Sequence, residues 1–334
     1  MRTSTEGRIR DRRRLDLGVT ASLLLREPEC ALAPVHPRAT LSLALRHSRC
    51  QLGIMREDKP SSTAAIVAGA RAAIDENPTI RDFADPFAER LLPPWYAAQD
   101  DSPVRRSYVR LVRRALRRGA HVIGLRTVAI DEGIRSAPDT GQVVILGAGL
   151  DARAWRMPEL AESTVFEVDH PATQRYKRER VADFPELADH RFVSVDFEHD
   201  SLDARLAACG HRIDVPTVWI WEGVTMYLRL EAIEATLGTL SQRSAVDSRL
   251  LVTYLPPSAA RRLVGIGTRL FGEGFHSAFD PGQMNALLNR FGFDVELDES
   301  ATEWHDHWAL DGVRLSLGFA AVERLATARR TDRA

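Results

Sequence analysis

The chain has 334 residues, of which 44% are hydrophobic and 27% are charged, an ordinary composition for a soluble globular protein. Its formal net charge of −1 creates no overall field that would attract nucleic acid or an anionic membrane surface. Because no apolar run reaches the roughly 18 residues of a membrane span, and the three cysteines show no metal or redox spacing, we expect no nucleic-acid partner, no membrane insertion, no metal site and a reduced, cytoplasmic setting.

Residues 1–54 differ in composition from the rest of the chain. They contain ten Arg, no Lys and five acidic residues, and their apolar residues come in short bursts without a helical period. Three interpretations fit: sequence translated upstream of a misassigned start, a disordered tail, or an Arg-rich targeting segment, since such segments are poor in acids. We favour the first two and assign the folded domain to residues 55–330.

Helical patterns open this domain. Residues 61–76 are Ala-rich and predict a helix, whereas residues 76–96 contain four prolines and predict an irregular connection. Two further helices are predicted at 105–118, where seven of 14 residues are Arg, and at about 119–135. We interpret the Arg-rich face as a solvated helix surface, because charge runs usually are.

Alternating patterns follow from residue 143 onward. Strands are predicted at 143–146, 164–168, 191–195, 216–221, 249–254, 292–297 and 313–323, with helices between them at 152–161, 171–184, 201–209 and 230–243. This alternation predicts an α/β domain with right-handed βαβ units and a mostly parallel, seven-stranded sheet. Residues 258–290 are helical and interrupted by glycine, and we expect a lid there over a mostly apolar pocket.

The first predicted strand runs into Gly147-Ala148-Gly149. In an open parallel sheet, ligands bind beyond the carboxyl ends of the strands. The two glycines allow a ligand to approach the backbone and tolerate positive φ. Gly147 and Gly149 with Ala152 even satisfy the dinucleotide fingerprint when taken alone, so the turn predicts a nucleotide-like cofactor without saying which one.

Acidic residues follow the next three strands. Asp169 lies 22 residues after Gly147, and a carboxylate there can accept both hydroxyl hydrogens of a ribose. Asp196 and Phe197 follow the third strand, where they would receive the amine of adenine and pack near its ring, and Glu222 follows the fourth. One such acid is equally well a helix N-cap, but three together indicate a pocket for an adenosine-bearing ligand with positive charge.

The charges then choose between two cofactors. The pyrophosphate of NAD would lie on the helix N-terminus after the glycine turn. That helix begins near Asp151, and Glu222 adds further negative charge, which disfavours an anion in a shielded cleft. S-adenosyl-L-methionine carries adenosine together with a sulfonium and an ammonium group. We therefore predict a methyl-donor site.

Five segments of the sequence resemble a known family. They are "LRTVAIDEGI" (125–134), "VVILGAGLDARAWRM" (143–157), "FEVDHP" (166–171), "VSVDFE" (193–198) and "EGVTMYL" (222–228). In this order and spacing they look like the leucine carboxyl methyltransferase-like family of class I methyltransferases, which includes bacterial O-methyltransferases of polyketide and other small-molecule pathways. The resemblance covers about residues 60–325. It implies a Rossmann-like sheet with helices on both faces, N-terminal helices and an inserted helical lid.

The resemblance also implies roles for individual residues. Arg126 would bind the methionine carboxylate, Asp169 the ribose, Asp196 and Phe197 the adenine, and Glu222 would lie against the cofactor. A guanidinium suits a carboxylate because it binds it bidentately; the alternative for Arg126 is a local pair with Asp131. The chain departs from the family pattern at two positions, with Ala152 in place of the usual Thr and Val128 where a second Arg is common, which leaves the fine contacts of the turn open.

The expected activity is transfer of a methyl group to an oxygen, carboxylate or hydroxyl, of a small-molecule acceptor, with a role in secondary metabolism. A carboxylate acceptor is already ionised, whereas a phenol with a pKa near 10 would be helped by a base. Candidate bases are His276, His305, His307 and Tyr254, and no catalytic residue is assigned. His305 and His307 would share one side of an extended segment, but without a third ligand we favour a surface turn over a metal site.

Two other classes of function stay open. One is an NAD-linked oxidoreductase, weakened by the acidic residues at the strand ends. The other is a non-enzymatic S-adenosylmethionine-binding or protein-interaction module, with which the basic helix at 105–118 is most compatible. Methylation of a protein C-terminus is a variant of the first function. The sequence identifies neither the acceptor, nor a base, nor the oligomeric state, nor the true start.

Overall fold

The computed structural model describes residues 61–94, 103–137, 141–196, 199–257, 275–315 and 322–332. All of them belong to the unit Arg38–Ala334. The predictions for residues 1–54, for Phe197 and for 258–274 of the expected lid lie outside the described residues.

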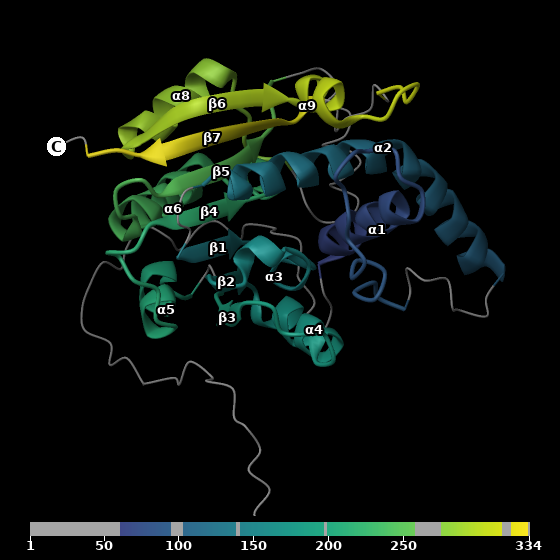
Figure 1. The fold of residues 1–334 in the computed structure, drawn as a ribbon, viewed down its shortest axis with the longest axis horizontal. Helices are drawn as coiled ribbons and strands as arrows, with labels where there is room; N and C mark the ends of the chain where they lie inside the picture. The colour runs from purple at the N-terminus through teal and green to yellow at the C-terminus, as the bar shows by residue number, and fades with distance from the viewer. Residues whose placement is uncertain are drawn as a thin grey trace, which may run out of the picture. The chain divides into compact units, whose positions relative to one another are not determined.

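A mostly parallel sheet of seven strands forms the centre of the fold, as predicted (Figure 1). The strand order is β3-β2-β1-β4-β5-β7-β6, and only β7 runs antiparallel to its neighbours. The strands are β1 (Gln142–Leu146), β2 (Thr164–Asp169), β3 (Asp189–Ser194), β4 (Thr217–Trp221), β5 (Arg249–Tyr254), β6 (Phe293–Ser300) and β7 (Arg324–Arg330). Because the chain reverses its strand order between β3 and β4, the carboxyl ends of β1, β2 and β4 are neighbours.

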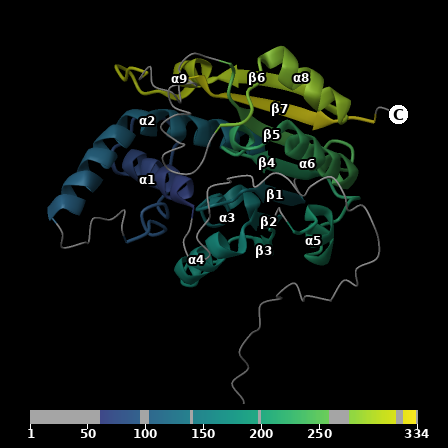
Figure 2. The ribbon, with the colours of Figure 1, turned by 180° about the vertical axis from the view of Figure 1, so that it is seen from behind.

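Helices cover both faces of this sheet (Figures 1 and 2). They are α1 (Ser62–Glu76), α2 (Pro103–Arg135), α3 (Arg153–Arg156), α4 (Pro171–Val181), α5 (Leu202–Ala208), α6 (Leu230–Arg243), α8 (Pro281–Arg290) and α9 (Ala301–Trp308), with short 3₁₀ turns η1 (Pro158–Leu160) and η2 (Thr225–Tyr227). On one face, Val143 and Ile145 of β1 pack in a cluster with Leu125 and Ile130 of α2. The inner strands β1 and β4 are buried along their whole length, as expected for parallel strands between two layers.

The opposite face packs against α5 and α6. Phe166 of β2 and Trp219 of β4 both contact the ring of His211, which follows α5, with ring centroids 5.5 and 5.1 Å apart. The indole of Trp219 also donates to Ser244 Oγ at the end of α6, at 2.8 Å. Period-2 alternation along β1, β2 and β4 therefore decides which side chains meet α2 and which meet α5 and α6.

Three predicted elements differ from the structure. The helices expected at 105–118 and 119–135 are one helix of 33 residues, α2, because a Gly such as Gly119 inside a helix costs only about 1 kcal/mol and does not end it. The last strand is β7 at Arg324–Arg330. Of the strand predicted at 313–323, the structure describes residues 313–315, 322 and 323, and none of these is in a strand. Strand β7 lies between β5 and β6, where four consecutive residues are buried, and its small Ala and Thr side chains hid this burial in the hydropathy pattern.

The segment of His305 and His307 is also different from the expected turn. It forms α9, which begins with a capping box in which Ser300 Oγ and Glu303 Oε2 each accept a main-chain amide hydrogen. Pro158 shortens the helix expected at 152–161 to the four residues of α3, followed by η1.

Two further observations concern expectations from composition. None of the helices in the described ranges combines the length and the apolar character that crossing a bilayer requires. Cys209 is buried.

Candidate functional site

The glycine turn after β1 is tied to the strand beside it. The amides of Gly147 and Ala148 donate to the carbonyl of Val168 at 2.8 and 3.0 Å. Gly147 has φ +67° and Gly149 has φ +52°, a region that favours glycine. A Cβ at Gly147 would also lie 2.7 Å from Val224 Cγ2. The turn thus requires both glycines and leaves its backbone uncovered by side chains of its own.

Asp169 ends β2 beside this turn, as predicted. Its Oδ2 accepts the amide hydrogen of Gly149 at 2.5 Å, and its Oδ1 accepts that of His170 at 2.6 Å. Burial raises the pKa of Asp169 above its usual value, and the two amides partly offset that effect. Each carboxylate oxygen accepts at two positions, so both retain one for a further donor, such as a ribose hydroxyl.

Asp196 lies at the end of the third strand, as predicted, but its side chain is engaged locally. Its Oδ2 is 2.9 Å from Nδ1 of His199, and its amide donates to Asp200 Oδ2 at 2.9 Å. The side chain is 37% exposed. Asp196 follows β3, the neighbour of β2, and the amide of Val195 donates to the carbonyl of Asp169 at 3.0 Å. The role of Phe197 is not addressed by the described residues.

Glu222 follows β4 and accepts hydrogen bonds from three buried arginines. Arg71 Nη2 and Arg126 Nε lie 2.9 Å from its Oε1, and Arg153 Nη1 lies 2.8 Å from its Oε2. Burial acts to raise the pKa of Glu222, but the three guanidinium groups outweigh it and hold the pKa well below the usual value. Glu222 is therefore a buried, ionised group at the carboxyl edge of the sheet.

Arg126 lies in α2 and bridges two carboxylates. It binds Glu222, and its Nη1 donates to both oxygens of Glu323 at 2.9 and 3.0 Å. These carboxylates raise the pKa of Arg126 despite its burial. The local pair with Asp131 that we considered does not form. Asp131 instead accepts from Arg153 Nε and from Arg156, all at 2.7 to 2.9 Å.

Arg71 and Arg153 are site residues that we did not predict from the sequence. Arg71 lies in α1, where its Nε donates to Thr127 Oγ1 at 3.1 Å while its Nη2 binds Glu222. Arg153 opens α3 and is fully buried. We searched for site residues at the ends of strands, and this search could not find Arg71, because Arg71 lies in α1, which precedes the first strand of the sheet. The sequence signal that could have indicated a role for Arg153 was its position two residues after Asp151, in the segment 143–157 that contains the glycine turn.

Asp151 needs a correction. We used its negative charge to argue against a pyrophosphate, but it accepts the amide of Arg153 at 2.7 Å and is paired with the Arg153 guanidinium. That guanidinium, followed by Arg71, lowers the pKa of Asp151 against the effect of burial. Its charge is therefore balanced locally, and the helix that follows has only four residues, so this argument alone does not separate the two cofactors.

The candidate bases are placed differently from one another. Tyr254 is fully buried and donates to Asp298 Oδ2 at 2.5 Å; burial, then Asp298, raises its pKa, which makes it a structural donor. His305 faces His121, with Nδ1 3.0 Å from Nε2. His276 is exposed. The described residues contain no group of three or more His, Cys, Asp or Glu arranged to hold a metal ion.

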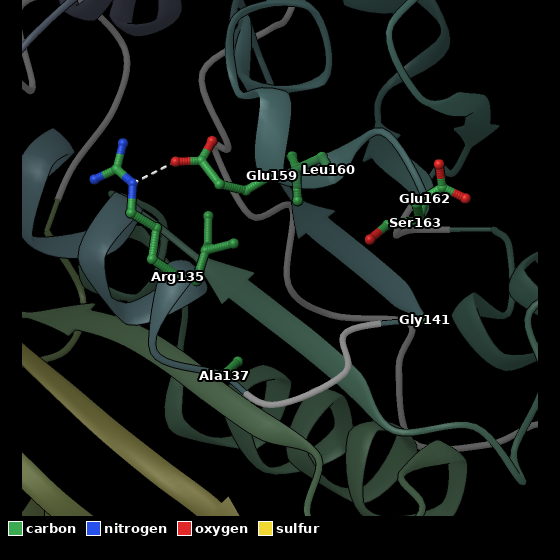
Figure 3. A pocket seen from close by; sticks show the side chains of 8 residues that line it. Arg135, Ala137, Gly141, Glu159, Leu160, Glu162 and Ser163 are labelled. Atoms are coloured by element: carbon green, nitrogen blue, oxygen red, sulfur yellow. Dashed lines mark hydrogen bonds and ion pairs between the residues drawn. The ribbon is translucent and has the colours of Figure 1, made fainter.

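A surface pocket of about 590 Å³ lies away from these residues (Figure 3). Its lining includes Gly141 and Ser163, which directly precede β1 and β2, and the ion pair between Arg135 and Glu159 at 2.6 Å. The pocket is thus at the amino ends of the strands, opposite the edge with Asp169 and Glu222. It does not correspond to the predicted cofactor position.

Comparisons with known proteins match most of this domain. The family model described as leucine carboxyl methyltransferase matches residues 64–241. A relative from Mycobacterium avium (strain 104), named "Putative S-adenosyl-L-methionine-dependent methyltransferase", is 34% identical over 281 residues, which cover 78% of this chain and 86% of that protein. A relative of the same name from Mycolicibacterium paratuberculosis is 36% identical over 202 residues, 58% of this chain and 66% of its own length.

Solved structures add a more distant likeness. The crystal structure of a "putative methyltransferase" from Thermobifida fusca YX has 17% sequence identity and a TM-score of 0.47, with 84% of this chain and 97% of that chain covered. At this level the likeness carries no argument about the site. The strand order and the family match, by contrast, confirm the predicted fold class and the resemblance.

Proposed function

The chain belongs to the leucine carboxyl methyltransferase family, and we propose that it transfers a methyl group from S-adenosyl-L-methionine to an oxygen, carboxylate or hydroxyl, of a small-molecule acceptor. Family membership makes S-adenosyl-L-methionine the cofactor. The observation that carries the proposal is Asp169, which is bound to the amide of Gly149 and still has free acceptor positions on both oxygens. Bound cofactor supplies an electrophilic methyl group on a sulfonium.

The residues around Asp169 fit such a group. Gly147 and Gly149 hold the turn in the positive-φ conformation beside Asp169, and Asp169 would hold the ribose hydroxyls. Asp196 and Phe197 would hold the adenine. Glu222 would lie against the cofactor, with its charge balanced by Arg71, Arg126 and Arg153.

Arg126 is the residue we assign to the methionine carboxylate. Its guanidinium already binds Glu222 and Glu323. The methionine carboxylate would therefore be a third carboxylate on the same guanidinium. Burial raises the pKa of Glu323, as does the neighbouring Glu222, while Arg126 lowers it. Glu323 is therefore the partner that most readily gives way to a ligand carboxylate.

The acceptor decides how much more the protein must do. For a carboxylate, positioning in line with the methyl group is sufficient, and no base is needed. For a hydroxyl, a base would help. His276, His305 and His307 remain candidates, since only Tyr254 is committed to Asp298. His276 follows Phe275 in the chain, and the ring centroids of Phe275 and Tyr227 are 5.2 Å apart. This aromatic pair could contact an acceptor near the exposed imidazole.

Other parts of the proposal rest on the sequence. A small-molecule acceptor from secondary metabolism follows from the family resemblance, and the cytoplasmic location stays a prediction. The oxidoreductase alternative is not favoured, because the family match concerns methyltransferases. A non-enzymatic binding module would bind the cofactor product without turnover of any acceptor.

Calorimetric titration with S-adenosylhomocysteine and, separately, NADH tests the site. We expect micromolar binding of the first by the wild type, at least a tenfold loss in Asp169→Ala, and no binding of NADH. Asp183→Ala is the matched control, since that aspartate is 75% exposed and pairs only at the surface with Arg90. Equal affinities in Asp169→Ala and Asp183→Ala would refute the assigned ribose site.

A further inference from the structure

A second buried ion pair lies directly behind Asp169. Lys177 of α4 donates to Glu167 Oε2 at 2.5 Å, and both side chains are about 1% exposed. Neither residue belongs to the proposed cofactor contacts. We propose that Lys177 is a positioning residue for the cofactor: by pairing with Glu167, it keeps Asp169 ionised and able to accept from the ribose. This inference rests on the proposed function of Asp169.

The local fold places these three groups together. Glu167 and Asp169 are two residues apart in β2, so they face the same side of the sheet. His170 caps α4 immediately after Asp169, with its Nδ1 accepting the amide of Ala172 at 3.2 Å. Two turns later, Lys177 points back to the strand. Gln174 fixes this return, because its Nε2 donates to the carbonyls of Glu167 and Val193 at 2.8 and 3.0 Å.

Stability alone does not explain this pair. Two apolar residues of similar volume in a buried position are often as stable as an ion pair or more so. The pair does have an electrostatic consequence, because Glu167 without a counter-ion would place a second negative charge next to Asp169. Two neighbouring carboxylates without a cation do not both ionise easily.

Several neighbouring groups together set the pKa of Asp169. Burial raises the pKa of Asp169; the amides of Gly149 and His170 and then the Lys177 ammonium lower it, and Glu167 raises it. From β3, His190 Nε2 lies 3.4 Å from Glu167 Oε1. In the glycine turn, Arg153 and then Arg71 lower the pKa of Asp151, and Lys177 adds a smaller effect in the same direction.

Removing Lys177 and removing Glu167 should therefore have opposite effects on the pH dependence of cofactor binding. Lys177→Met leaves Glu167 and Asp169 without the ammonium, so the pair of carboxylates takes up a proton at milder acidity. A proton on Asp169 removes an acceptor for the ribose. Glu167→Gln leaves Lys177 positive and keeps Asp169 ionised to lower pH. The double variant Glu167→Gln/Lys177→Met removes both charges and lies between them.

The test is calorimetric titration with S-adenosylhomocysteine at two pH values. At about pH 8 we expect Asp169 to be ionised, and at about pH 5.5 a carboxyl group with a raised pKa begins to take up a proton. The readout is the ratio of the two dissociation constants. We expect this ratio to rise about five- to tenfold in Lys177→Met, to stay at or below the wild-type ratio in Glu167→Gln, and to be intermediate in the double variant. A purely structural role would move both single variants in the same direction, and that result would overturn the inference.

Folding and site assignment are controlled separately. Thermal unfolding at both pH values shows which variants fold; if Lys177→Met does not, the double variant must still show a higher ratio than Glu167→Gln, or the inference fails. If the wild type does not bind S-adenosylhomocysteine, or Asp169→Ala binds it equally well, the proposed function fails and this inference with it. If Asp169→Ala loses binding but all ratios are equal, only the role of Lys177 is wrong.

Discussion

The two edges of the sheet both hold buried polar networks, but they are built differently. At the carboxyl edge, the arginines Arg71, Arg126, Arg153 and Arg156 meet the carboxylates Asp85, Asp131, Asp151, Glu222 and Glu323. In this group, Arg153 Nη2, Arg156 Nε and both oxygens of Asp85 have no hydrogen-bond partner among the described residues.

At the amino edge, the network around Gln142 is neutral. Gln142 donates to the carbonyls of Arg212 and Val215 and to Thr217 Oγ1, at 2.9, 3.3 and 3.2 Å, and accepts the amide of Arg212 at 2.8 Å. His211 contacts Thr217 Oγ1 at 3.1 Å. A network that only stabilises a fold tends to satisfy its members, whereas charges and unfilled donors are typical of a site that awaits a ligand. The difference supports the carboxyl edge as the functional one.

The largest effect is expected from Glu222→Gln at the carboxyl edge. It removes the charge that three buried guanidinium groups share, and breaking a buried ion pair costs about 3–5 kcal/mol in the free energy of unfolding. Urea denaturation measures this loss. Glu234→Gln is the control, because Glu234 pairs with the exposed Arg290 and should change stability by less than about 1 kcal/mol. Equal losses in the two variants would remove the distinction between this network and a surface pair.

A smaller effect is expected from acid at the amino edge. Burial, followed by Arg243, lowers the pKa of His211 to about 4, whereas an unfolded chain has a His pKa of about 6.5. The unfolded state therefore binds more protons in this range, so stability is complete above about pH 6.5 and is lost as the pH falls toward 4. The loss is about 3 kcal/mol at most.

The measurement is the free energy of unfolding between about pH 7 and 4 in the wild type and in His211→Gln. We expect a shallower slope in the variant. His121, whose pKa burial and then His305 lower to about 4, contributes in the same direction and stays in both proteins. Identical slopes would show that His211 is not protonated on unfolding in this range.

The smallest effect is expected from Gln142→Leu, which cuts the neutral network. It leaves the amide of Arg212 and two carbonyls without their partner, at a cost of about 1–3 kcal/mol. Thermal unfolding reports the loss, and S-adenosylhomocysteine affinity should not change, since Gln142 opens β1 at the amino edge. A tenfold weaker affinity would mean that the two edges are coupled.

Local pattern and chain order already indicated much of this molecule. Period-2 alternation, the glycine turn and Asp169 are local features, because a strand, its tip and the turn after it involve neighbouring residues. The order of the inner strands follows from right-handed βαβ connections. The prediction failed where local signals conflict with packing: β7 has small and charged residues that resemble a surface segment, and α2 passes through Gly119 without a break.

What the sequence by itself determined is the edge at which the candidate site residues gather, since each strand carries its candidate residue at its own end. Only the tertiary structure decided the charge balance there. Arg71 is 151 residues from Glu222 and Arg126 is 197 from Glu323, and no periodicity links positions so far apart. Pairing of buried charges depends on which helices pack over the sheet, because a desolvated ion takes the nearest counter-ion in space, however distant it is along the chain.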